Sequence, residues 1–90
     1  MNTNYNPLET TAEEMAMITQ MHRAETVQHH LRKIMQTIMA MAECGSYNAY
    51  YNVECDKEMA QLIEEKLLAK GFKVDLTPIG RSFEFGVNWK

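Results

Sequence analysis

The longest uninterrupted helix pattern of this chain covers residues 12–44, and it constrains every fold that the chain can adopt. Two overlapping capping boxes mark its start, Thr10 with Glu13 and Thr11 with Glu14, in which a hydroxyl and a carboxylate satisfy free backbone amides. No Pro or Gly interrupts the pattern. A helix of this size is about 50 Å long. We therefore expect it to need a partner along its length.

The apolar face of this helix can be written as heptads, and Gly45 follows at a usual place for a left-handed cap. The two core positions of the heptad hold Met17, Ala24, Leu31 and Ile38, and Gln20, Val27, Ile34 and Met41. The stripe is widened on one side by Met21, Met35 and Ala42. This width favours packing against a sheet or a bundle over a narrow two-stranded seam.

Three later segments alternate apolar and polar residues with a period of two, which is typical of half-buried strands. They cover residues 46–53, 72–77 and 82–89. The last segment is the most apolar, and its large side chains fall on one side: Phe83, Phe85, Val87 and Trp89. A turn over residues 78–81 joins the second and third strands.

A second, shorter helix pattern covers residues 57–70. Asp56 fits its N-cap, and Gly71 fits its C-terminal end. Its apolar side consists of Met59, Ala60, Ile63, Leu67 and Leu68. The chain therefore alternates in the order helix, strand, helix, strand, strand.

This order predicts an α+β domain over residues 11–90, preceded by a flexible arm over residues 1–10. A helix joins the first two strands in a right-handed crossover, and the last two form a hairpin. Pro78 suits an edge strand because proline cannot donate to a ladder. We therefore expect a three-stranded sheet of order 1-3-2, with both helices on its apolar face and a polar face left open.

The charge balance excludes some classes of partner. Nine basic against twelve acidic residues give a net charge of -3, which does not favour nucleic acid or an anionic membrane. No apolar run approaches the roughly 20 residues that span a bilayer, and the N-terminus does not resemble a signal peptide. We expect a soluble, intracellular protein that does not bind membranes. Cys44 and Cys55 are then two free thiols, with a disulfide between them as the alternative.

Metal, cofactor and catalytic motifs are weak. His22, Glu25 and His29 recur on the polar side of the long helix, but a metal site there would need ligands from a facing element. The sequence has no nucleophile elbow, no Gly-rich phosphate loop and no paired carboxylates in a plausible pocket. We expect no metal, no cofactor and no enzyme activity.

Nucleic-acid binding remains a distant alternative. Residues 29–33 form a short basic patch, but they stand in an acidic background. Tyr50 is the one tyrosine of its strand that belongs to the polar face. Tyr47 and Tyr51 fall on the apolar side, so we do not expect a base-stacking platform.

The chain resembles small proteins of unknown function that are encoded by tailed bacteriophages. The likeness covers residues 31–89 and rests on a helix ending in CGSY, a Tyr-rich strand, a helix ending in LLAKGFKV and a last strand SFEFGVNW. It implies a virion component, or a protein that binds and redirects a host factor, in the bacterial cytoplasm or in the virion. No functional residue carries over from it.

Two functions follow from the long helix. The first is a homo-oligomeric structural or assembly protein, because residues 15–28 are expected to have no cover in their own chain. Its predicted interface consists of Met17, Met21, Ala24, Val27 and Leu31. The second is an inhibitor or adaptor that presents the helix, or the polar sheet face, to a host protein.

Overall fold

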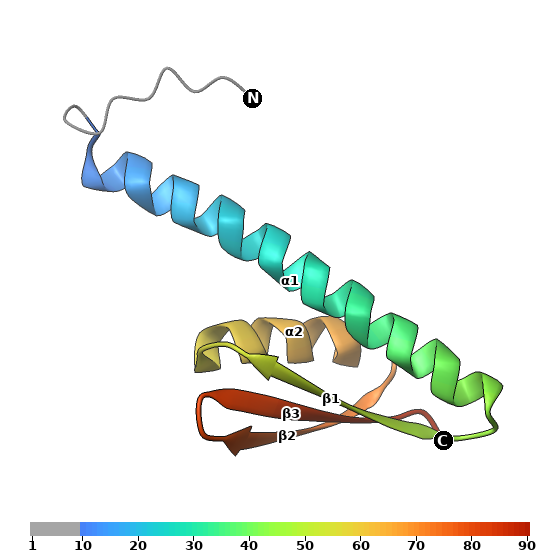
Figure 1. Ribbon diagram of the computed structural model, residues 1–90. Helices are drawn as coiled ribbons and strands as arrows, with labels where there is room; N and C mark the ends of the chain where they lie inside the picture. The colour runs from blue at the N-terminus through green and yellow to red at the C-terminus, as the bar shows by residue number, and fades with distance from the viewer. Residues whose placement is uncertain (1–9) are drawn as a thin grey trace.

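The computed structural model describes residues 10–90, which form a layer of helices on a three-stranded sheet (Figure 1). The helices are α1, Ala12–Glu43, and α2, Lys57–Ala69. The strands are β1, Asn48–Glu54, β2, Lys73–Ile79, and β3, Ser82–Asn88. The predicted arm over residues 1–10 lies outside the described residues except for Thr10.

Side-chain oxygens cap the N-termini of both helices. At α1 the Thr11 hydroxyl accepts a hydrogen bond from the backbone N–H of Glu14 at 3.2 Å. At α2 the Asp56 carboxylate accepts one from the N–H of Met59 at 2.8 Å. Each cap satisfies an amide that has no partner within the helix. Thr11, the threonine of the second predicted capping box, is thus the N-cap of α1.

Both helices end in the same cap motif, one residue before the predicted end. Gly45 adopts φ 85°, and its N–H donates to the carbonyl of Ala42 at 2.9 Å. The N–H of Ser46 donates to the carbonyl of Met41 at 2.9 Å. This pair of bonds is the Schellman motif, which needs a left-handed residue after the cap. Gly71 ends α2 in the same way.

The sheet confirms the predicted order, β1-β3-β2, and β3 is antiparallel to both neighbours. Phe85 of β3 lies opposite Tyr51 of β1 and Leu76 of β2. Its side chain is fully buried. The strand with the largest apolar side chains therefore takes the central place, where it has a neighbour on each side.

Two strand boundaries differ from the prediction by two residues, and three others, at Glu54, Lys73 and Asn88, differ by one. β1 begins two residues late because the Ser46 hydroxyl bonds to the backbone of Asn48, accepting from its N–H at 3.3 Å and donating to its carbonyl at 3.0 Å. β2 continues through Pro78 to Ile79, so the turn shrinks to residues 80–81. An edge strand tolerates Pro78 because only one side of it needs donors.

Both helices cover the same face of the sheet, as expected (Figure 1). The core between these layers has one cluster of side chains: Val27, Leu31, Ile34, Ile38, Ala49, Val53, Met59, Ala60, Ile63, Leu67, Phe85 and Val87. The molecule measures 54 × 28 × 21 Å. Its long axis follows α1, whose N-terminal end extends past α2 and the sheet (Figure 1).

Candidate functional site

Arg23 ties the N-terminal half of α1 to the start of α2. Its Nη2 donates to both carboxylate oxygens of Asp56, at 2.9 and 2.8 Å, and lies 4.0 Å from Oε1 of Glu58. Asp56 also caps α2, so one carboxylate serves both helices. The Arg23 guanidinium, helped by the Met59 amide, holds the pKa of the Asp56 carboxyl below its usual value. These contacts join the start of α2 to α1 at the level of Arg23.

Two of the five predicted interface residues are buried in the single chain and are therefore not free for an interface. Val27 and Leu31 are 4% and 8% exposed, and both belong to the core of this chain. β1 runs back under α1, so the chain enters α2 beneath the N-terminal half of the long helix (Figure 1). The expectation that residues 15–28 lack cover in their own chain is therefore wrong at Val27.

The other three predicted interface residues lie at the surface. Met17 and Met21 are 59% and 58% exposed, and Ala24 is exposed as well. None of residues 12–22 is buried. The apolar side chains on this overhanging part of α1 are exposed, except for Ile18, which is half-buried.

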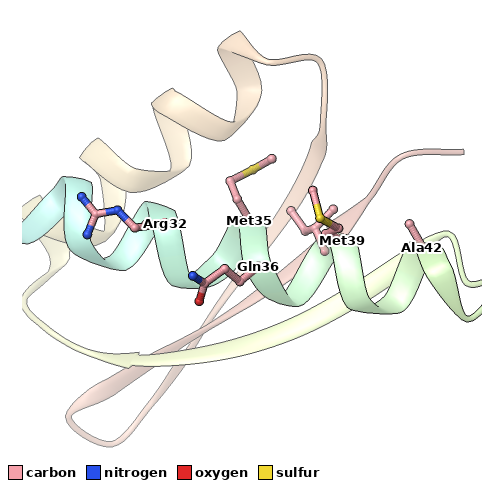
Figure 2. A pocket seen from close by; sticks show the side chains of 6 residues that line it. Arg32, Met35, Gln36, Met39 and Ala42 are labelled. Atoms are coloured by element: carbon pink, nitrogen blue, oxygen red, sulfur yellow. The ribbon is translucent and has the colours of Figure 1, made fainter.

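A groove lies on the C-terminal half of α1 (Figure 2). It has a volume of about 410 Å³, and its lining includes Arg32, Met35, Gln36, Ile38, Met39 and Ala42. Met39 is 65% exposed, whereas Met35 is half-buried against the core. The heptad pattern assigns Met35 and Ala42 to a widening of the core stripe and leaves Met39 outside it. Met35, Met39 and Ala42 follow one another at steps of four and three residues, and this helical spacing is the pattern that could have identified the surface from the sequence.

A smaller groove of about 210 Å³ lies between the two helices. Ala24, Val27 and Gln28 line it from α1, and Leu62 and Lys66 line it from α2. Leu62 is 37% exposed. Apolar surface thus continues along α1 between the overhang and the larger groove.

We use the term methionine flank for the side of α1 on which these exposed apolar residues lie. Helical periodicity puts its members on one side, since they follow one another at steps of three, four and eleven residues. The members of the methionine flank are Met17, Met21, Ala24, Met35, Met39 and Ala42. It borders the core stripe, and its member Met35 also packs against the core.

The histidines of α1 do not form a metal site. His22 Nδ1 lies 3.8 Å from Oε2 of Glu25, and both side chains are about three-quarters exposed. The ring of His29 contacts that of His30 edge-on, with centroids 5.4 Å apart. Partial burial, with His29 beside it, lowers the pKa of His30. Over residues 10–90 no three His, Cys, Asp or Glu side chains are grouped to hold a metal.

The face of the sheet that points away from the helices is polar. Tyr50, Gly86 and Asp75 form one row across the three strands, with Glu84 in the next row. Tyr50 is 66% exposed, and its ring lies over Gly86, where an added Cβ would come within 3.2 Å of Cε1. The ring occupies the space that a side chain at position 86 would need.

The other tyrosines and the two cysteines in or beside β1 have different surroundings from Tyr50. Tyr47 precedes β1 and is 53% exposed, with the Lys90 ammonium 5.5 Å from its ring centre, while Tyr51 is half-buried against the core. Cys44 and Cys55 are both free thiols. Burial, and then the charge of Asp56, raises the pKa of the Cys55 thiol.

Comparison with protein-family models, with curated proteins and with solved structures gives no match for this chain. Between residues 10 and 90 neither helix has an apolar stretch that could cross a membrane. Function is therefore inferred from the surfaces of the molecule itself.

Proposed function

We propose that the chain is a non-enzymatic, phage-encoded interaction protein that self-associates through α1 as a structural or assembly component. It would act in the bacterial cytoplasm or in the virion, with a second copy of itself as first partner. Neither a cofactor nor a nucleic acid is part of this proposal.

The overhang of α1 is the observation that supports the proposal most. Met17 and Met21 are more than half exposed there, on a helix segment without any buried residue. The radius of gyration is 16.4 Å, against about 12 Å for a compact chain of this length. Exposed methionines adapt readily to an apolar partner surface, and an unsupported helix end gains most from one.

Light scattering of the purified chain tests self-association. We expect a particle heavier than one chain of 10.4 kDa at tens of micromolar. Met21→Glu should raise the dissociation constant about tenfold or more, because it puts a charge into the apolar contact. Met15→Glu is the matched control, since Met15 is also exposed on α1 but lies on another side of the helix. A wild-type monomer at this concentration would contradict the proposal.

Val27 and Leu31 are unsuitable positions for this test. Because both are buried in the single chain, a charge at either position would unfold the protein as well as weaken an interface. The exposed members of the methionine flank avoid this ambiguity.

The open face of the sheet supports a second candidate, a host-directed inhibitor or adaptor. Tyr50 stands 66% exposed on that face, in the same row as Asp75 and one row from Glu84, and exposed tyrosines are common anchors in protein interfaces. A pull-down from a bacterial lysate should then recover one dominant protein with the wild type and lose it with Tyr50→Ala. Recovery of the bait alone would count against this candidate.

A further inference from the structure

The methionine flank carries one short pattern twice. Residues 17–24 and residues 35–42 both read Met-x-Thr-x-Met-x-x-Ala. The second copy begins 18 residues after the first, which is about five helical turns, so equivalent side chains point the same way roughly 27 Å apart. One side of α1 therefore presents the same apolar surface at two places.

Neither copy of the pattern is fully covered by its own chain. Met17 and Met21 of the first copy are 59% and 58% exposed on the overhang. Met39 of the second copy is 65% exposed, and with Met35 and Ala42 it lines the larger groove (Figure 2). The two exposed places lie at opposite ends of one helix.

We propose that two copies of this chain pair their α1 helices antiparallel along the methionine flank, so that residues 17–24 of each copy lie on residues 35–42 of the other. This inference rests on the self-association proposed above and specifies its face, direction and register. The twofold axis crosses α1 near residues 29 and 30. An interface of this kind uses one surface on both subunits, which must be complementary to itself.

The repeat provides this complementarity. In the antiparallel register Met17 lies beside the partner's Ala42, and Ala24 lies beside the partner's Met35, so a long side chain faces a short one at each place. Met21 lies beside the partner's Met39. A parallel pair would instead set Ala24 beside Ala24 and leave the long side chains to face one another.

Charged residues along the border of the methionine flank also favour the antiparallel direction. The antiparallel register brings Glu25 of each copy close to Arg32 of the other, twice per dimer. A parallel pair would set Arg32 of one copy and Glu25 of the other on opposite borders of the contact, where they do not meet, and complementary charges help to fix the register of an interface. Glu14 and the partner's Glu43 meet only at the two ends, where both are exposed and screened by solvent.

Cysteine cross-linking tests the direction and the register. The starting chain carries Cys44→Ser and Cys55→Ala, and the test variant adds Met21→Cys and Met39→Cys at two exposed positions. Within one helix these positions are roughly 27 Å apart, far beyond the reach of a disulfide. Mild oxidation should therefore give a covalent dimer in most of the protein.

The single variant Met21→Cys is the matched control. In the antiparallel register its two thiols are again about five turns apart, so it should stay monomeric on a denaturing gel. A covalent dimer from this single variant would mean parallel pairing and would overturn the inference.

Two further outcomes separate the inference from the proposed function. If light scattering gives a dimer while the double cysteine variant does not cross-link, self-association stands and the register is wrong. A monomer in light scattering overturns both. In addition, Met39→Glu should weaken the dimer about tenfold, as Met21→Glu does, whereas Ala40→Glu on the next position should not.

Discussion

Replacing Val27 by alanine tests whether its side chain is buried within one chain or only between two chains. Val27 is 4% exposed in the single chain. Removal of two buried methyl groups costs about 1.6 kcal/mol of transfer free energy, and incomplete collapse of the site adds roughly 1 kcal/mol. The better helix propensity of alanine returns about 0.5 kcal/mol. We therefore expect the free energy of unfolding to fall by about 2 kcal/mol.

Urea unfolding followed by circular dichroism measures this change. It should be done below one micromolar, and again at a concentration about a hundred times higher. A loss of about 2 kcal/mol corresponds to a melting temperature lower by roughly 8–16 °C in a domain of this size. The control is Met21→Ala, whose side chain is 58% exposed and which should stay within about 0.5 kcal/mol of the wild type at low concentration.

The two variants should therefore differ even when the protein is dilute. Equal stability of Val27→Ala and Met21→Ala below one micromolar, with a loss only at high concentration, would refute the reasoning. Val27 would then be covered by a second copy and not by its own β1 and α2.

Two other substitutions test the ends of the helices. Because the pKa of Asp56 is lowered in the folded state, its contribution is present above the unfolded pKa of about 3.9 and is lost as the pH falls through the folded value. The variant Asp56→Asn still caps α2. Its free energy of unfolding should be lower than that of the wild type at pH 7, but it should fall less steeply below about pH 4. Parallel pH curves for the variant and the wild type would contradict this. Gly45→Ala should cost about 1 kcal/mol in thermal unfolding because of φ 85° alone, since no atom lies within 4 Å of the added Cβ; an unchanged melting temperature would contradict it.

Local rules predicted most of the fold. Thr11 and Asp56 could be predicted as caps because each has a side-chain oxygen at the point where the first turn of a helix leaves backbone amides without acceptors. The place of β3 at the centre follows from its three large apolar side chains, Phe83, Phe85 and Val87, which find most cover between two neighbouring strands. The strand ends were less accurate because periodicity registers neither the hydrogen bonds between Ser46 and the backbone of Asn48 nor the pairing of Pro78 with Phe83.

The candidate interface was predicted only in part. Met17, Met21 and Ala24 are exposed, as a helix without cover requires. The groove beside Met39 was missed because its exposure depends on how much of α1 the other elements leave uncovered. Heptad spacing identifies which side of a helix is apolar, but it contains no information on which other element reaches that side.

By itself, the sequence determined the helices, the strands, their caps and the apolar side of each element, because these depend on neighbours within a few residues. Only the tertiary structure decided how the apolar surface of α1 is shared. The start of α2 reaches α1 at Arg23, which bonds to Asp56, and with α2 in this place Val27 lies in the core and Met21 in solvent. That division depends on a contact between residues 33 positions apart, so no local pattern could have predicted it.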